Sequence, residues 1–150
     1  MRKLTIFIIL TVFVGLFAST ALPKKNCKKQ YSNEISKLKG LLKYKEANET
    51  YIGKLCKMRS EKEKGIFLPG PCTKAYKHIF DNIEKAMDDF KECRLYNTKK
   101  KTGACEHVTR VKNQPIDFIK KWSPDSIRQG VFEDISNKAA EVQAKIPNCK

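Results

Sequence analysis

Residues 76–90 read YKHIFDNIEKAMDDF and carry the clearest structural signal of the chain. Their large apolar side chains recur at steps of three and four residues, at Tyr76, Ile79, Phe80, Ile83, Met87 and Phe90. This spacing places them along one face of an α-helix. Cys72 and Cys93 lie near the two ends of the stretch. The sequence therefore predicts an amphipathic helix that packs against other helices and is tied to them at both ends.

A similar but weaker period precedes this helix. The apolar positions of the earlier stretch are Tyr31, Ile35, Leu38, Leu42, Ile52, Leu55 and Cys56. They predict either one long helix or two helices in line, with a possible break near residues 47–49. Residues 61–71 contain two glycines and two prolines, which predict a loop.

The segment after the central helix predicts further helices. Residues 105–111 form a short helix in this interpretation, and Pro115 then opens a separate turn. Ser123-Pro124-Asp125 predicts the start of the last helix, with Ser123 as its N-cap, and this helix runs to about Ile146. One side of that helix carries Ile127, Val131, Ile135, Val142 and Ile146. We expect an all-α fold, a single compact domain of four to five helices held by disulfides.

The N-terminal residues predict export. Met1-Arg2-Lys3 is a short basic segment, residues 4–17 are almost wholly apolar, and small residues follow up to Ala21. This order is typical of a secretory signal peptide, and the apolar run falls short of the ~20 residues that span a bilayer. We expect cleavage after Ala21 and a secreted, extracellular domain of residues 22–150 with no integral membrane association. Loss of Arg2 and Lys3 would lower the formal net charge from +15 to +13.

Six cysteines follow the expected cleavage point, at Cys27, Cys56, Cys72, Cys93, Cys105 and Cys149. An even number in an oxidising compartment predicts three disulfides, and the spacings do not resemble those of zinc sites. The sequence allows fifteen ways of pairing them. We favour the pairing that joins Cys56 to Cys72 and Cys105 to Cys149, which leaves Cys27 with Cys93.

Motifs of familiar enzymes are missing from the sequence. Neither His78 nor His107 is followed by an aspartate, as a secreted phospholipase would need, and there is no nucleophile elbow, phosphate-binding glycine loop, zinc-protease motif or EF-hand. Glu84, Asp88 and Asp89 form a carboxylate cluster that we interpret as a solvated helix face. His78 falls off the apolar stripe, so we expect an exposed imidazole. The sequence thus predicts a non-enzymatic protein with no catalytic residues, no metal and no cofactor.

Lysines are the candidate binding residues. They cluster in three places, and the candidates are Lys24, Lys25, Lys28, Lys29, Lys99, Lys100, Lys101, Lys120 and Lys121. If the disulfides bring these segments together, they form one cationic surface for sulfated glycans, anionic membranes or acidic proteins. The alternative is that they are separate solvated lysines. Nucleic acid is disfavoured by the compartment and by the excess of lysine over arginine.

Asn48-Glu49-Thr50 is an N-glycosylation sequon. A glycan on Asn48 would place that stretch at the protein surface.

The short basic signal, the spaced cysteines, the helical stretch from Cys27 to Cys56 and the later Trp122-Ser123-Pro124 together resemble salivary proteins of blood-feeding flies. Within that group the chain is most similar to the anophensin and albicin family of mosquitoes. The resemblance implies an all-helical, non-enzymatic inhibitor that binds a host plasma protein, either a contact-pathway factor or the alternative complement convertase. It assigns a role to no individual residue.

A small-ligand carrier of the odorant-binding or D7 class is the alternative function. In that class the second and third cysteines stand close together, whereas fifteen residues separate Cys56 from Cys72 here. A carrier of amines or lipids should enclose an apolar pocket of some hundreds of Å3, whereas an interaction protein should have a filled core and place its distinctive groups outside.

Overall fold

The computed structural model describes residues 26–64, 70–96 and 103–150, and the side chains of residues 60–64 lie outside that description. Within these residues the chain forms six helical segments and no strand, which confirms the all-α, disulfide-linked fold. Residues 1–21, where we expect a signal peptide and its cleavage point, lie outside the described residues. None of the described helices combines the length and apolar character needed to cross a bilayer.

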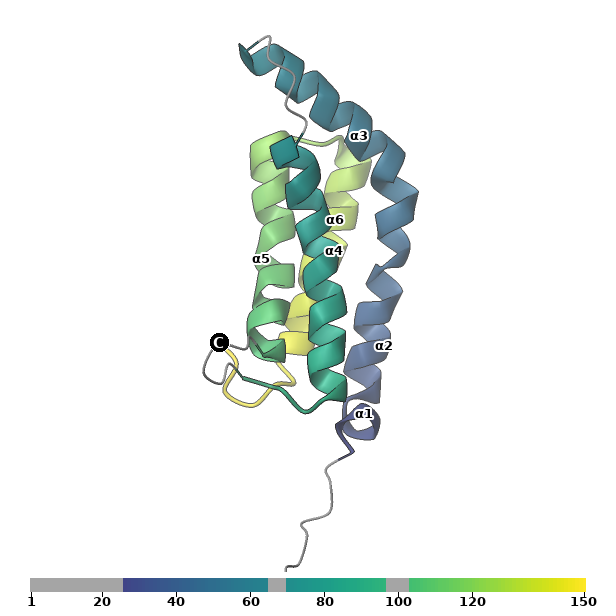
Figure 1. Cartoon of the computed structure of the whole chain (residues 1–150), viewed down its shortest axis with the longest axis vertical. Coiled ribbons are helices and arrows are strands. Elements are labelled where there is room, and N and C mark those ends of the chain that lie inside the picture. Colours follow the sequence, from purple (N-terminus) through teal and green to yellow (C-terminus); the bar gives the residue numbers. More distant parts are fainter. Residues whose placement is uncertain (1–25, 65–69, 97–102) are drawn as a thin grey trace, which may run out of the picture.

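The helices run alternately up and down in an antiparallel arrangement (Figure 1). A single turn, α1 (Cys27–Gln30), leads into α2 (Ser32–Leu41) and α3 (Lys43–Lys64), which continue in nearly the same direction. The chain returns in α4 (Gly70–Lys91), rises in α5 (Ala104–Trp122) and descends in α6 (Ser126–Gln143). The helices thus form four columns, namely α1–α3, α4, α5 and α6. Because α2 contacts both α4 and α6, the four columns close around one core.

The core is filled by side chains from all four columns. Phe80, Phe90 and Phe132 are among its largest fully buried residues. The rings of Phe118 and Phe132 lie 4.8 Å apart between their centroids and join α5 to α6. The apolar stripe expected on residues 76–90 is buried as predicted. Its first residue, Tyr76, packs against the rings of Phe118 and Phe132 on the other helices.

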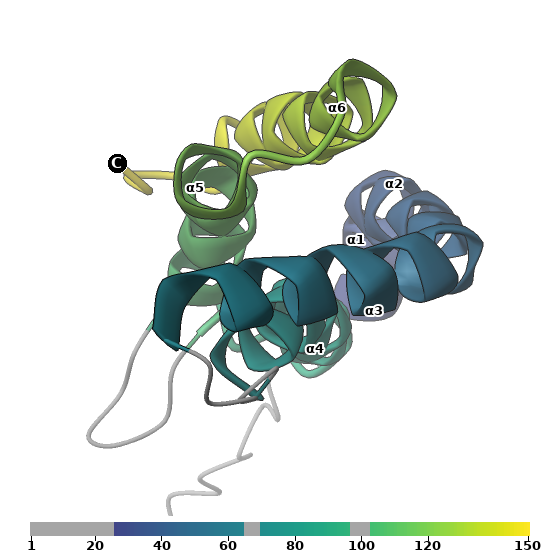
Figure 2. The same ribbon diagram turned by 90° about the horizontal axis from the view of Figure 1, so that it is seen from above.

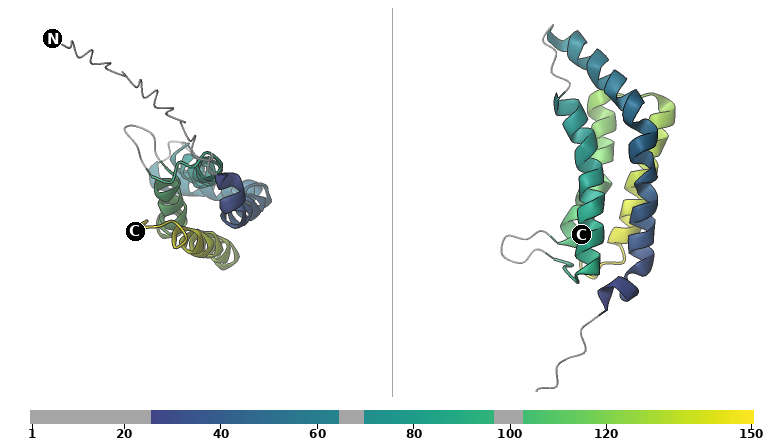
Figure 3. Two further views of the ribbon diagram at one scale, coloured as in Figure 1. Left: turned by 90° about the horizontal axis from the view of Figure 1, so that it is seen from below. Right: turned by 45° about the vertical axis from the view of Figure 1, so that its right-hand side comes forward.

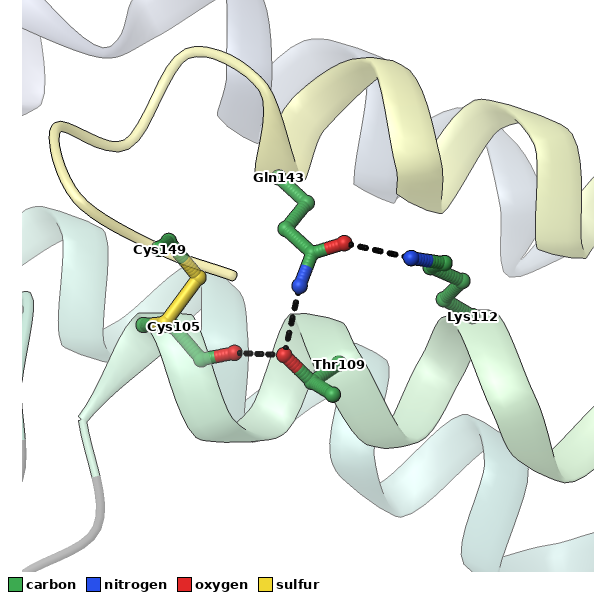
Figure 4. Close-up of a disulfide and its surroundings, with 5 residues drawn as sticks. All are labelled: Cys105, Thr109, Lys112, Gln143 and Cys149. Carbon is green, nitrogen blue, oxygen red and sulfur yellow. Dashed lines mark hydrogen bonds between the residues drawn. A yellow bond between two sulfur atoms is a disulfide. The ribbon is translucent and has the colours of Figure 1, made fainter.

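All three disulfides have the pairing that we favoured. Cys27 is bonded to Cys93, Cys56 to Cys72, and Cys105 to Cys149. The first ties α1 to the end of α4, and the second ties α3 to the start of α4. The third holds the C-terminal segment against the start of α5 (Figure 4). Each bond therefore joins segments that only tertiary packing brings together.

A polar seam accompanies the Cys105–Cys149 bond between α5 and α6 (Figure 4). Gln143 is 5% exposed, its Nε2 donates to Thr109 Oγ1 at 2.8 Å, and its Oε1 accepts from Lys112 Nζ at 3.0 Å. Thr109 Oγ1 donates in turn to the Cys105 carbonyl at 2.7 Å. Because every polar atom of the Gln143 amide has a partner, the buried side chain is accommodated without an unsatisfied group.

Several helix boundaries differ from the sequence prediction. The break in the first arm lies at Leu42, because residues 47–49 are inside α3. At this break the buried Tyr76 hydroxyl donates to the carbonyls of Tyr44 and Lys45, at 3.1 and 2.6 Å. Burial raises the pKa of the Tyr76 phenol, and the nearby Glu49 carboxylate adds to this shift, so the donor stays protonated. A side chain from α4 thus stabilises the carbonyls where α2 gives way to α3.

The expected loop at residues 61–71 is shorter than predicted. The α3 helix continues to Lys64, and α4 already begins at Gly70, with Pro71 in its first turn. Proline suits this position because the first helical N–H groups have no intrahelical acceptor.

The predicted break at Pro115 is also wrong. One continuous α5 runs from Ala104 to Trp122 with a buried Pro115 in its interior. The apolar stripe of α5 continues on both sides of the proline, at Val108, Val111, Phe118 and Trp122, and packing of that stripe outweighs the local cost of the proline.

The start of the last helix was assigned to the wrong residue. Asp125, not Ser123, is the N-cap of α6, since its carboxylate accepts from the Arg128 N–H at 2.9 Å. Ser123 instead ends α5 in the left-handed region, with φ 44°. Ile127 is 71% exposed and lies off the buried side of α6, which carries Phe132, Ile135, Ala139 and Val142.

Candidate functional site

A groove between α4 and α5 is the candidate functional site. Ala75 and His78 of α4 line one side, and Gln114, Asp117, Phe118, Lys121 and Trp122 of α5 line the other. The α5 residues recur at helical spacing, so one face of that helix presents all of them. The groove has a volume of about 190 Å3 and is open to solvent.

The floor of the groove is aromatic, and its rim is polar. Phe118 and Trp122 are 2% and 8% exposed, with 6.5 Å between their ring centroids. The Lys121 Nζ lies 5.1 Å from the centroid of the Trp122 ring, which places a cation beside the floor. His78 is exposed, as predicted, and stands on the opposite wall with the exposed Asp117 near it.

Hydrogen bonds fix the walls of this groove. Asn82 of α4 is buried, and its Nδ2 donates to the Gln114 Oε1 at 3.0 Å and to the His78 carbonyl at 2.7 Å. One amide thereby holds Gln114 and the backbone of His78 in place across the two helices. The groove is therefore preformed by its supporting residues.

The end of α5 is held from α3, which crosses over the top of the bundle (Figure 2). Arg59 of α3 donates through Nε to the Trp122 carbonyl at 3.2 Å and through Nη2 to the Ser123 carbonyl at 3.3 Å. Tyr51 accepts from the Asp125 N–H at 2.9 Å, and the Arg128 guanidinium lies 4.6 Å from its ring centroid. These contacts cap the last carbonyls of α5 and keep Trp122 at the groove.

A second hollow lies beside the first, between α5 and α6, with a volume of about 370 Å3. Five of its six lining residues are polar, namely Lys112, Asn113, Asp117, Lys120 and Ser136, and only Ile116 is apolar. Such a wide, mostly polar surface offers little apolar area for a ligand to bury.

Four of the nine candidate lysines belong to the described residues, and these four form two separate pairs. Lys28 and Lys29 of α1 are exposed at the lower end of the bundle, whereas Lys120 and Lys121 are exposed at the upper end of α5 (Figures 1 and 3). The length of α4 between these ends corresponds to roughly 20 Å or more at 1.5 Å per residue. This exceeds the Debye length of about 8 Å at physiological ionic strength, so the two pairs act separately. Lys24, Lys25 and Lys99 to Lys101 lie outside the described residues.

The carboxylate cluster divides into exposed and buried members. Glu84 and Asp88 are exposed and pair with Lys45 and Lys91, which agrees with a solvated face. Asp89 is 2% exposed, so its assignment to that face was wrong. Its Oδ1 accepts from Arg94 Nε at 2.7 Å, and its Oδ2 lies 2.8 Å from Nδ1 of the buried His107. The signal for this pair was present, because Asp89 and His107 both fall on the apolar sides of their helices.

The Asp89 cluster has the composition of a catalytic pair but lies inside the protein. His107 is 5% exposed, and Arg94 occupies the other carboxylate oxygen of Asp89. A substrate cannot reach the pair in this conformation, so we interpret it as a tie between the end of α4 and the start of α5. Among the described residues, no group of three or more histidine, cysteine or carboxylate side chains could hold a metal ion.

The expected glycan at Asn48 conflicts with the folded structure. Asn48 is 7% exposed within α3, and its Nδ2 donates to the Tyr44 carbonyl at 2.9 Å. A glycan would be attached to this nitrogen and would need space that neighbouring residues occupy. We therefore interpret Asn48 as a buried structural residue and propose that its sequon carries no glycan.

Comparisons with known proteins place the chain in no family: no protein-family model, no curated protein and no solved structure matches it. The fold and the groove therefore rest on the chain's own residues.

Proposed function

We propose that this protein is a secreted, non-enzymatic inhibitor that binds a host plasma protein and blocks a host defence cascade. The resemblance to anophensin and albicin supports the choice of cascade, which would be the alternative complement pathway, contact activation or both. The observation that carries the proposal of a binding protein is the contrast, within the described residues, between a core occupied by large apolar side chains and an open groove. Phe80, Phe90 and Phe132 fill the interior, while Trp122 and Lys121 border the groove at the surface.

This contrast favours an interaction protein over a small-ligand carrier. Pockets for drug-sized ligands measure roughly 300–1,000 Å3 and enclose most of the ligand. The groove at Trp122 has about 190 Å3 and remains open, so it suits one side chain of a larger partner. The hollow between α5 and α6 has about 370 Å3, within that range, but it is also open to solvent and would not enclose a ligand. Interfaces are often anchored by a few such side chains in well-packed pockets.

The positive charge supports capture of an acidic partner. With a formal net charge of +13 after loss of Arg2 and Lys3 with the expected signal peptide, long-range attraction should speed encounter with acidic proteins and sulfated glycans. Salt should therefore slow association more than it speeds dissociation.

The test uses the product that eukaryotic cells secrete from the full-length gene, with its disulfides formed. This product is added to human plasma, and alternative-pathway complement, classical-pathway complement and contact activation are measured side by side. We expect inhibition of the alternative pathway or of contact activation, and loss of inhibition after reduction and alkylation of the cysteines. Normal activity in all three assays would contradict the proposal and favour the carrier.

A further inference from the structure

The aromatic floor of the α4–α5 groove is formed by two residues of the core and is held in place by neighbouring hydrogen bonds. Phe118 and Trp122 belong to the core, yet both line the groove. Arg59 and Asn82 hold the segments around them, so little ordering is needed before a ligand enters. The two rings of the floor are tilted by 44° to each other, and an aromatic floor favours an aromatic ring, since rings pair in offset or edge arrangements.

Positive charge predominates around this floor. Lys121 lines the groove, whereas Lys120 lines the neighbouring hollow between α5 and α6, and Asp117 borders both. On the opposite wall Lys74 precedes His78 by four residues and flanks it on the same face of α4. Asp117 is the single carboxylate among the groove's lining residues. The surroundings therefore favour an anion beside the ring.

The small volume restricts the occupant further. A hollow of about 190 Å3 falls below the usual range for drug-sized ligands and matches one large side chain. A carboxylate next to that side chain would lie at the rim, where Lys121 provides a charged donor.

We propose that this groove is the docking site for an aromatic side chain of the partner protein, with an acidic residue next to it in the partner's sequence. This inference rests on the proposed function, because it names the surface through which the plasma partner is bound. Phe118 and Trp122 contact the ring, Lys121 pairs with the neighbouring carboxylate, and Asn82 positions the wall through Gln114.

The groove can be tested without the partner, because Trp122 is the only tryptophan of the chain and reports on its own site. The probes are 3-phenylpropionate, its neutral analogue 3-phenylpropionamide, the amine phenethylamine, and propionate, which lacks the ring. Binding is followed through Trp122 fluorescence at constant ionic strength, with excitation above the absorption of the phenyl group. We expect Kd of about millimolar for 3-phenylpropionate, given its few atoms.

The order of affinities decides between the alternatives. We expect 3-phenylpropionate to bind most tightly, the amide more weakly, the amine more weakly still, and propionate not at all. Tightest binding of the amine would show that Asp117 sets the charge preference and would overturn the proposal. Equal binding of propionate, or no response to any probe, would also overturn it.

A charge reversal with a matched control tests the role of Lys121. Lys121→Glu should weaken 3-phenylpropionate binding about fivefold, because an attractive exposed pair becomes a repulsive one. Lys145→Glu makes the same change in net charge at an exposed residue beyond α6 and should leave binding unchanged. Equal effects of the two variants would assign the change to net charge alone and would overturn the proposal.

The same two variants separate this inference from the proposed function. If the unaltered protein inhibits a plasma cascade, Lys121→Glu should lose most of that inhibition and Lys145→Glu should keep it. Full inhibition by Lys121→Glu would remove the groove from the interface and leave the proposed function intact. Inactivity of the unaltered protein would contradict the proposed function and, with it, the assignment of a plasma partner to the groove.

Discussion

His107 Nδ1 lies 2.8 Å from Asp89 Oδ2, and both side chains are buried where the end of α4 meets the start of α5. Arg94 donates to the other oxygen of the same carboxylate. Asp89 therefore joins Arg94, just beyond α4, to His107 in the first turns of α5. Disulfides lie beside both residues, with Cys27–Cys93 next to Arg94 and Cys105–Cys149 next to His107.

Replacing Asp89 by alanine should lower the free energy of unfolding by about 2–4 kcal/mol, because it leaves the buried His107 imidazole without its acceptor and removes one of the two carboxylates, Asp89 and Glu92, that pair with Arg94. Asp88→Asn is the control, since Asp88 is exposed and pairs only at the surface with Lys91. That variant should change stability by less than about 0.5 kcal/mol. Chemical denaturation of both variants measures the difference, and similar losses would contradict a structural role for Asp89.

Gly103 and Gly130 should respond in opposite ways to alanine. A Cβ on Gly103 would lie 2.5 Å from backbone atoms of Tyr96, next to the bonds from the Ala104 and Cys105 N–H groups to the Arg94 and Leu95 carbonyls. Gly103→Ala should therefore cost about 1–3 kcal/mol. Gly130 is an exposed residue within α6 with nothing within 4 Å of an added Cβ, so Gly130→Ala should stabilise by about 0.5–1 kcal/mol. Thermal unfolding of the two variants gives both signs.

The three disulfides should differ in their contribution to stability. Cys27–Cys93 spans 66 residues of sequence, whereas Cys56–Cys72 spans 16. If the bonds act by restricting the unfolded chain, removing the longer link should cost about 4 kcal/mol and removing the shorter one about 3 kcal/mol. Variants with each pair replaced by alanine, unfolded in guanidinium chloride, test this order. A larger loss from the shorter link would show that packing around the bond outweighs chain entropy.

Asn48 should carry no glycan in the secreted, folded protein, because its amide nitrogen is already bonded inside α3. Treatment with a peptide N-glycosidase should leave the mass unchanged. Asn48→Ala should destabilise the protein by about 1–2 kcal/mol through loss of the bond to the Tyr44 carbonyl. Thr50→Ala destroys the same sequon at an exposed residue, so it should leave stability unchanged and should alter the mass only by the substitution itself.

Asp134 should contribute an acid-sensitive part of the stability. A hydrogen bond from Lys138 lowers the pKa of the Asp134 carboxyl, partial burial opposes this, and the Tyr44 hydroxyl lowers it further. Because the folded pKa lies below the unfolded one, the contribution is complete above about pH 4–5 and is lost as pH falls through the folded pKa. Asp134→Asn should therefore be less stable than the unaltered protein at pH 7, by less than about 1 kcal/mol at this partly exposed site. The gap should narrow as pH falls through the folded pKa, and a gap of equal size at pH 7 and in acid would contradict this account.

Local patterns predicted the elements better than their boundaries. The stripe of residues 76–90 identified α4 because burial of six large apolar side chains on one face outweighs every competing local preference. Pro115 misled the prediction because its local cost is overcome by packing of the α5 residues on both sides, which the sequence does not display. The break at Leu42 escaped prediction because the Tyr76 hydroxyl, which bonds the Tyr44 and Lys45 carbonyls in the next turn, belongs to a residue more than thirty positions away.

The candidate site was predicted only in part. Lys120, Lys121 and Trp122 were singled out, and Lys121 and Trp122 do line the groove. Ala75, Gln114 and Phe118 were not, because nothing in their own sequence neighbourhoods distinguishes them from ordinary helical residues. Conversely, Asp89 looked like one of several surface carboxylates until its helix was packed against α5.

By itself the sequence determined that the chain is helical, basic and held by three disulfides, because helix period, charge and cysteine number are properties of composition and local spacing. Only the tertiary structure decided which polar residues are buried, how far apart the described lysine pairs lie and where a groove exists. Those properties depend on the relative rotation of α3, α4 and α5, which sets whether side chains such as Asp89, Asn48 and Trp122 meet a partner or solvent. Distances between residues far apart in sequence follow from packing of whole helices, and no local pattern contains them.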